Sequence, residues 1–234
     1  MDFCDSSSWE WYHYVSLGSL ILGALELLVP LITVLFSGSS KIPIKANHLD
    51  HLEFIDKFYL VVNRFITVMF VHHLSRFLCW SKIPWKLSSM TISNTLLTLP
   101  LCFIAYDLFY TLFHHFLHFR FIYGFIHKHH HRQQSPTRGY IDASNVHPIE
   151  FILGEYLHLL IVFLLSWTHG ITVIAFLLLG AVMASLNHTR YDVFLPVGVY
   201  SVKYHDIHHR LPEWNMGQYV LFWDRLLGSF RDYQ

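Results

Sequence analysis

Residues 107–131 read DLFYTLFHHFLHFRFIYGFIHKHHH and hold seven of the chain's 19 histidines within 18 positions, from His114 to His131. The apolar first half predicts a helix, in which His114 and His118 share one face because they are four residues apart. Asp107 precedes His114 by seven residues and falls on the same face. Two imidazoles at this spacing can bind one metal ion, so the stretch predicts a metal site at the end of a helix.

The same spacing recurs twice. His127, His130 and His131 follow nine residues after His118, and His205, His208 and His209 lie in YHDIHH near the end of the chain. We leave His129 out of the second group, whose register is ambiguous. His188, in LNHTRYD, lies between the second and third groups, and His147, in VHPIE, is a further candidate. His115 is turned about 100° from His114 on a helix and is not expected to bind metal.

These nine or ten imidazoles suggest two metal ions. A structural zinc needs four ligands and a catalytic zinc about three. Three cysteines, at positions 4, 79 and 102, are too few and too scattered for a cysteine-based site. Neutral nitrogen ligands suit zinc, copper, iron or nickel. Among these, iron can bind and reduce oxygen to attack an unactivated C–H bond, whereas zinc cannot change its redox state.

Composition indicates a membrane protein. Of 234 residues, 53% are hydrophobic and 14% are charged, against about 25% charged in a typical soluble domain. Sixteen Lys and Arg balance sixteen Asp and Glu, so no basic field would attract nucleic acid, and we expect no nucleic-acid partner.

Apolar stretches predict the helices. Val15–Phe36, Leu60–Trp80 and Ile92–Phe113 are each about long enough to cross a bilayer, and residues 151–186 form two shorter stretches split at 166–170, which predicts a helical hairpin. Glu26 lies inside the first stretch, so we expect it to have a partner. The sequence thus predicts an all-α integral membrane bundle of about four transmembrane helices with a histidine-rich di-metal cap.

Charge predicts the orientation and the organisation. Asp2, Asp5 and Glu10 precede the first stretch, which favours a span with a lumenal N-terminus over a signal peptide. Lys and Arg flanking the histidine groups place these groups on the cytosolic side. We expect residues 1–91 to form an N-terminal membrane region with two spans, and residues 92–234 to form the histidine-box domain.

The motifs together resemble a known superfamily. Their order is H-x-x-x-H, H-x-x-H-H, a lone histidine in N-H-x-x-Y-D, and Y-H-D-x-H-H, followed by N-x-G at 215–217 and W-D-x-x-x-G at 223–228. This order is similar to that of the fatty acid hydroxylase and sterol desaturase superfamily of integral membrane di-iron enzymes, over residues 92–230. Asn-Met-Gly replaces the usual Asn-Tyr-Gly, and His-Thr-Arg-Tyr replaces the His-Ser-Gly-Tyr of many sterol members, which leaves the subfamily open.

The resemblance implies two iron ions, molecular oxygen as co-substrate, and electrons from NAD(P)H through cytochrome b5 or its reductase. It also implies residence in the endoplasmic reticulum. Asp107, Tyr191 and Asp206 would orient imidazoles. The implied metal ligands are His114, His118, His127, His130, His131, His188, His205, His208 and His209, with His147 as an additional candidate.

The function expected from these motifs is oxygen-dependent hydroxylation or desaturation of a lipid, a sterol or related lipid first. A fatty acyl or sphingoid-base hydroxylase is the alternative within the superfamily. A zinc-dependent membrane hydrolase is the alternative of another class, but it would leave over half of the histidines unexplained. We expect His72 and His73 to be interior or interfacial side chains rather than ligands. The other histidines are expected at the surface or at the membrane interface, and these are His13, His48, His51, His158 and His169.

Overall fold

The computed structural model describes residues 9–195 and 199–234, so Cys4, Asp2 and Asp5 lie outside the described residues. The described chain is mostly helical, as expected. Its strands, β1 (Phe194–Leu195) and β2 (Tyr200–Ser201), form one short antiparallel pair. The helices are α1 (Trp11–Leu35), α2 (Phe54–Trp80), η2 (Leu87–Ser89), α3 (Thr98–Leu117), α4 (Arg120–Tyr123), η3 (His127–Arg132), α5 (Tyr140–Ser144), α6 (Pro148–Leu164), α7 (Gly170–Asn187), α8 (Val202–Arg210) and α9 (Phe222–Leu227).

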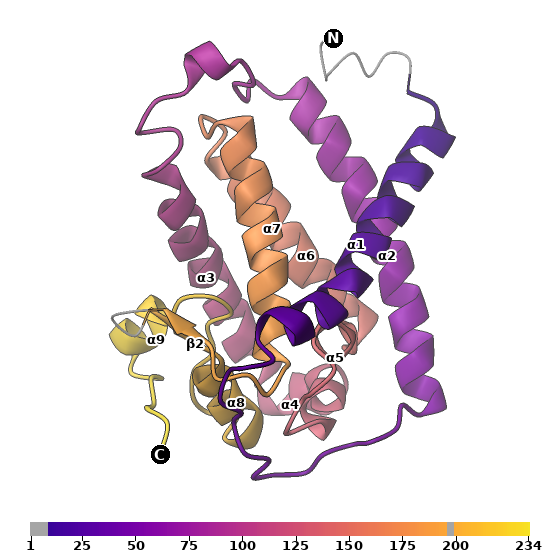
Figure 1. Cartoon of the computed structure of the whole chain (residues 1–234), viewed down its shortest axis with the longest axis vertical. Helices are drawn as coiled ribbons and strands as arrows, with labels where there is room; N and C mark the ends of the chain where they lie inside the picture. The colour runs from indigo at the N-terminus through magenta and orange to yellow at the C-terminus, as the bar shows by residue number, and fades with distance from the viewer. Residues whose placement is uncertain (1–8, 196–198) are drawn as a thin grey trace.

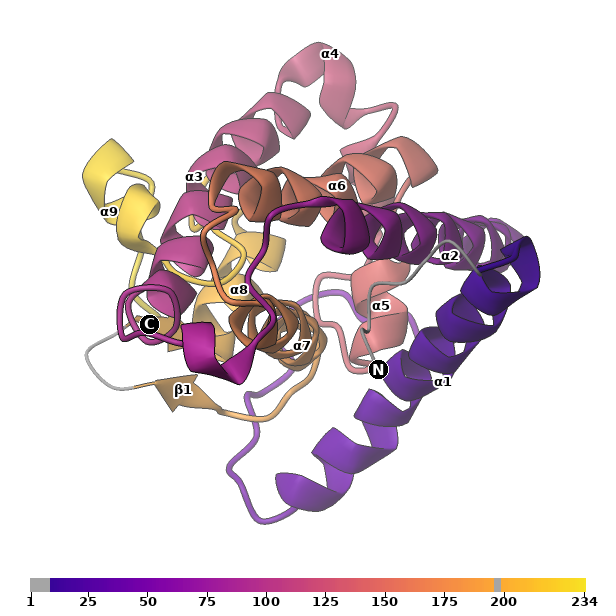
Figure 2. The same ribbon diagram turned by 90° about the horizontal axis from the view of Figure 1, so that it is seen from above.

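The long helices α1, α2, α3, α6 and α7 form a bundle, and the short elements α4, α5 and α8 gather at one end of it (Figure 1). Seen along the bundle, α7 lies at the centre, with α3 and α6 on one side and α1 and α5 on the other (Figure 2). The histidine-bearing segments therefore form a cap on one end of a helical bundle.

Two of the helices in the described part of the chain, α1 and α7, are long and apolar enough to cross a membrane by length and composition. The predicted count of about four is not confirmed. Arg64 and Arg76 interrupt α2, and α6 has only 17 residues. The predicted hairpin is confirmed, because α6 ends at Leu164 and α7 begins at Gly170.

The third predicted helix is displaced toward the histidines. Helix α3 begins at Thr98 rather than Ile92, because residues 92–97 form turns, and it continues to Leu117 rather than ending at Phe113. His114 therefore lies inside the helix, and His118 forms its C-cap.

The core lies between α3, α6 and α7. Phe103 packs edge-on against Phe176 with ring centroids 5.0 Å apart, and Ile161 and Phe176 are fully buried. In contrast, the outer face of α1 exposes large apolar side chains such as Leu20 and Val34. A continuous apolar outer surface of this kind is what a bilayer requires.

Glu26 forms the ion pair that was expected of a charged residue inside an apolar stretch. Its Oε1 lies 2.6 Å from an Nη atom of Arg64 on α2, so each charge neutralises the other. This ion pair joins α1 to α2 at a depth where an unpaired charge is costly.

Two of the histidines expected at the surface lie inside instead. His169 is fully buried and caps α7, because its ring accepts the N–H of Ile171 and its Nε2 contacts the carbonyl of Lys86. His158 bonds to the hydroxyl of Tyr219 at 3.0 Å and packs on Tyr106. Neither role could be predicted from the sequence, since helix capping by His169 and the ring contacts of His158 follow no periodic pattern.

The α6–α7 turn predicts a sensitive position. A Cβ on Gly170 would overlap the ring of Trp85, so Gly170→Ala should lower the free energy of unfolding by about 1–3 kcal/mol. Thermal unfolding in detergent measures the change. Gly23→Ala on α1, where a Cβ meets nothing within 4 Å, is the control and should not destabilise. Equal stability of the two variants would contradict the packing described here.

Candidate metal centre

Four separate segments of the chain deliver the nine predicted imidazoles to one place. The end of α3 carries His114 and His118, η3 carries the second histidine box, His188 forms the C-cap of α7, and α8 carries the third box. Eight of the nine are buried, and His118 is partly buried. The cap thus encloses them in the protein.

The imidazoles separate into two groups, and within each group the candidate ligand atoms lie within 4.8 Å of one another. The second box is divided between them, because consecutive side chains of the η3 helix point in different directions. Group one is His114, His118, His127, His131 and His208. Group two is His130, His188, His205 and His209.

Within each group the Nε2 atoms converge. The spacing between neighbouring Nε2 atoms is 2.9 Å for His114 and His127, 3.0 Å for His127 and His131, 3.1 Å for His131 and His208, 3.4 Å for His130 and His188, 3.2 Å for His188 and His205, and 3.1 Å for His205 and His209. Two imidazole nitrogens bound to one ion at about 2.1 Å would lie about 3.0 Å apart at a right angle and about 3.4 Å apart at a tetrahedral angle. The observed spacing therefore fits a shared metal ion in each group.

Hydrogen bonds on the far side of the rings set the proton positions. The Nδ1 atoms of His114, His188 and His208 donate to the backbone carbonyls of Met216, Ala184 and Trp214 at 2.7–2.8 Å. A carbonyl only accepts, so in a neutral ring the proton is on Nδ1 and Nε2 presents a lone pair. These three rings are held in the form that binds metal.

His118 supplies a second indication. Its Nε2 atom is buried and has no hydrogen-bond partner among the described residues. A buried ring nitrogen without a partner is costly, and a metal ion in group one would satisfy it. The residues of both groups therefore fit bound metal.

Burial keeps these rings neutral. It lowers the pKa of every histidine in the two groups, to about 4 for His118 and about 3 for His131, with neighbouring imidazoles contributing in the same direction. For the other seven the direction is the same. Neutral imidazoles are the metal-binding form, so the cap is ready to bind metal at neutral pH.

Glu150 supports group one and was not among the predicted residues. It lies in the first turn of α6, is 7% exposed, and places Oε1 2.9 Å from Nδ1 of His127. A carboxylate behind a metal-binding histidine fixes its ring and raises its basicity. The only sequence signal was an acidic residue at the start of a helix, which is common for unrelated reasons.

The predicted orienting residues contact backbone groups or other side chains instead of imidazoles. Asp107 accepts backbone N–H groups of residues 218–220. Asp206 pairs with Arg190 and Arg210, and Tyr191 packs against Phe36 and pairs with Lys41. Each one therefore holds a segment that borders the cap, which corrects the expectation of direct contact with a ring.

Asp224 explains the two motifs that follow the third box. Its carboxylate accepts the N–H groups of Met216 and Gly217 and the hydroxyl of Ser229. A Cβ on Gly217 would lie 2.9 Å from an oxygen of Asp224. The N-x-G and W-D-x-x-x-G motifs thus hold the Met216 carbonyl against His114.

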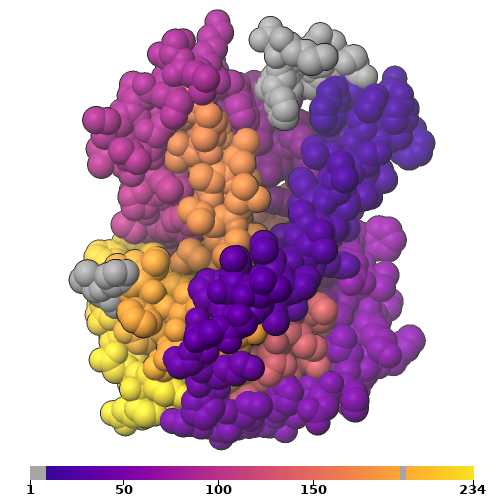
Figure 3. Space-filling view, in the orientation of Figure 1, coloured from indigo at the N-terminus to yellow at the C-terminus, as the bar shows by residue number. Residues whose placement is uncertain are grey.

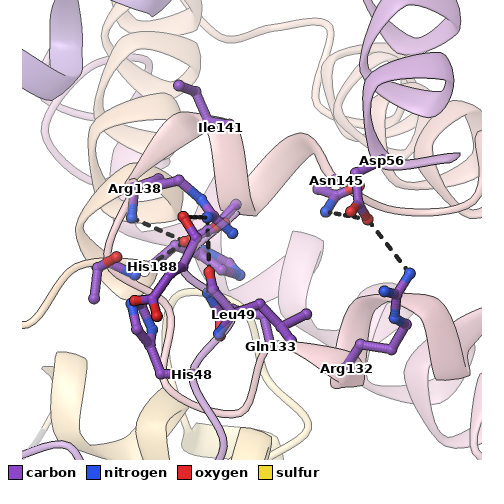
Figure 4. Close-up of polar contacts among 12 residues, drawn as sticks. His48, Leu49, Asp56, Arg132, Gln133, Arg138, Ile141, Asn145 and His188 are labelled. Atoms are coloured by element: carbon purple, nitrogen blue, oxygen red, sulfur yellow. Dashed lines mark hydrogen bonds and ion pairs between the residues drawn. The ribbon is translucent and has the colours of Figure 1, made fainter. Parts of the chain in front are cut away.

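His147, the additional candidate, lies outside both groups. It caps α6 by accepting the N–H of Ile149. His129, left out of the predicted set, lies within 3.0 Å of Asn145 and Asp56, and Figure 4 shows Asp56 between Asn145 and Arg132. His115 is exposed.

The connection between α1 and α2 is bonded to the segment that follows the second box. Leu49 donates its N–H to Gln133 and accepts from Arg138, both at 2.8 Å, and His48 bonds to the carbonyl of Ser135; Figure 4 shows this network beside His188. His48 is therefore partly buried. The network fixes the segment that leads from η3 to α5.

The comparisons with known proteins agree with this geometry. The family model for fatty acid hydroxylase matches residues 99–229, more than half of the chain, and these residues include all nine grouped histidines. This chain belongs to the fatty acid hydroxylase family. The division of the chain at residue 91 stays a prediction.

Several curated proteins are similar to this fatty acid hydroxylase family member. Methylsterol monooxygenase 1 of Rattus norvegicus is 31% identical over 135 residues, which are 55% of this chain and 44% of the relative. The C-4 methylsterol oxidase of Schizosaccharomyces pombe is 26% identical over 61% of this chain and 50% of its own length. Sphinganine C4-monooxygenase 1 of Arabidopsis thaliana is 29% identical over 56% of this chain and 52% of its own.

The chain spans about half the length of the curated relatives it matches. No solved structure matches it.

Removal of the Glu150 carboxylate should weaken metal binding. Loss of such a supporting group typically costs 10–100-fold in metal affinity, so Glu150→Ala should release metal to a chelator at a correspondingly lower chelator concentration than the parent. Elemental analysis after chelator titration measures this. Glu213→Ala, on the exposed loop after α8, is the control, and an unchanged titration in Glu150→Ala would show that the carboxylate does not support the site.

Acid should destabilise the metal-free protein. Because burial lowers the pKa of these histidines in the fold, the unfolded chain binds more protons once the pH falls below about 6.5, the ordinary histidine value. The free energy of unfolding therefore keeps its full value above this pH and decreases as the pH falls toward about 4, the pKa of His118 in the fold. Thermal unfolding of the metal-free protein at several pH values between about 7 and 5 tests this prediction. An unfolding midpoint that does not change with pH would contradict it.

Proposed function

We propose that the chain is a membrane lipid oxygenase that carries two iron ions in its histidine cap. The observation that carries this proposal is the pair of adjoining histidine groups, with five and four converging imidazoles. Iron bound there would supply the reduction of molecular oxygen needed to oxidise a lipid C–H bond. Membership in the fatty acid hydroxylase family supports the same reading.

The residues of the chain do three things in this proposal. The carbonyls of Met216, Ala184 and Trp214 hold protons on Nδ1 atoms and leave Nε2 atoms free to bind metal. The buried rings exclude water from the site. Glu150 holds the ring of His127.

Lipid access is supported by the connection between the first two boxes. Phe119, Phe121 and Phe125 are all exposed there, the last by 84%. Between them, Tyr123 stacks on His118 with ring centroids 5.5 Å apart. Exposed aromatic side chains next to the metal groups suit a membrane surface, and the reacting carbon would come from a lipid.

For the substrate we propose a sterol or related lipid first and a sphingoid base or fatty acyl chain second. The names of the relatives support this order, since two act on methylsterols and one on sphinganine. Hydroxylation and desaturation both begin with hydrogen abstraction, and the proposal covers both.

We further propose cytochrome b5 or its reductase as the electron donor, with NAD(P)H as the source, and the endoplasmic reticulum as the location. Lys41, Lys45, Arg120 and Lys128 flank the cap, which supports a cytosolic orientation by the positive-inside rule.

A zinc hydrolase is the competing function. Such a site uses about three protein ligands and one general base, so one group alone would suffice and the other would have no role. The proposed oxygenase with two iron ions uses both histidine groups.

Metal content and activity test the proposal together. The parent protein should hold about two irons per chain and oxidise lipid only with oxygen and a reductant; His208→Ala, in group one, and His130→Ala, in group two, should each lose metal and lower turnover by at least about 100-fold. His115→Ala, with an exposed ring, is the matched control and should keep both. One tightly held zinc per chain, retained in both variants, would refute the proposal.

A further inference from the structure

A polar cluster lies inside the bundle, apart from the histidine groups. Glu155 on α6 accepts a hydrogen bond from the hydroxyl of Thr67 on α2 at 2.8 Å, and Tyr140 on α5 lies beside both. Thr67 is 2% exposed. We call Thr67, Tyr140 and Glu155 the interior polar cluster.

One atom of this cluster has no role within the fold. Oε2 of Glu155 is buried and makes no hydrogen bond with any described residue. A buried carboxyl oxygen without a partner costs free energy that folding alone does not recover. A buried ionisable side chain with an unsatisfied oxygen therefore points to a ligand or a pathway.

The cluster lies within reach of the metal groups. Glu155 follows Glu150 by five residues on the same helix, and Glu150 contacts His127 of group one. Five helical residues span about 7.5 Å along the axis. They also turn by about 140° around it, so Glu150 and Glu155 face different sides of α6. On its own side the cluster approaches group two, because Gly139, the neighbour of Tyr140, donates its N–H to the carbonyl of His188. A lipid headgroup held at Glu155 would therefore leave its further carbons near group two.

Polar side chains also connect the cluster to the lipid-facing surface. The Glu26–Arg64 pair is about half exposed, and both residues lie near Tyr140. In the upper part of the view α1 diverges from α7, and the surface is hollowed between the two helices (Figure 3). A small polar headgroup entering there meets polar partners along its way to Glu155.

We propose that Glu155, held by Thr67, binds a free hydroxyl group of the lipid substrate. The inference rests on the proposed function and narrows its substrate class to lipid alcohols, such as sterols or sphingoid bases. A carboxyl group can hydrogen-bond a hydroxyl whether it is ionised or neutral.

Binding of matched lipids tests the proposal without any turnover. Purified full-length protein in detergent is titrated with cholestanol and with cholestane, which lacks the hydroxyl, and in parallel with sphinganine and with octadecylamine. In at least one pair the parent should bind the alcohol about tenfold more tightly or better, as expected for one hydrogen bond to a buried carboxyl group. Glu155→Leu should reduce this ratio to about one.

Matched variants separate recognition from folding. Thr67→Val removes the supporting hydroxyl and should lower the ratio partially, whereas Glu213→Gln, on the exposed loop after α8, should leave it unchanged. A purely structural role for Glu155 would weaken both members of a pair equally, so the ratio within each variant distinguishes the two roles.

The parent protein alone can refute the proposal. Equal binding of alcohol and analogue in both pairs, or no binding of any of the four lipids, refutes it. An unchanged ratio in Glu155→Leu refutes it as well. Iron content and oxygen-dependent lipid oxidation are measured on the same preparations. If the parent has neither iron nor oxygen-dependent lipid oxidation, the proposed function is refuted. If it has both but shows no preference for the hydroxyl group, only this inference is refuted.

Discussion

The convergence of unprotonated imidazole nitrogens in a buried cap is the constraint on which the rest of the structure depends. Nine such rings are costly to bring together without metal, because each loses its hydration and their lone pairs face one another. Backbone carbonyls reduce this cost where they hold Nδ1 protons, as Met216 does for His114. The surrounding fold is arranged to keep those carbonyls in place.

Much of the conspicuous sequence outside the histidine boxes serves this purpose. Asp224 and Asp107 hold the segment 216–220 through backbone N–H groups, and Asp206 with Arg190 ties α8 to the connection that follows α1. These carboxylates do not contact the rings but hold the segments beside them. Their charge is used to order irregular backbone, which has no helical hydrogen bonds of its own.

The membrane sets the second constraint. Polar groups within the bundle must find partners in the protein, as Glu26 does in Arg64 and Thr67 in Glu155. Where no described residue is a partner, as at Oε2 of Glu155, burial of the polar group costs free energy. The hydroxyl of a lipid alcohol would complete that hydrogen bond and connect the bundle to the chemistry of the cap.

Local pattern was enough to predict the helical class, the α6–α7 hairpin and the nine histidines that converge, because helical spacing and residue type are properties of short segments. It did not predict how His127, His130 and His131 divide between two groups, that His147 and His169 cap helices, or that Glu150 lies behind His127. The two caps are local, because each ring accepts an N–H two residues along the chain, but no periodicity marks them. The division of the second box and the place of Glu150 depend on where α6, α7 and α8 pack against η3. Only the tertiary structure decides these two, since their contacts join residues up to 77 positions apart.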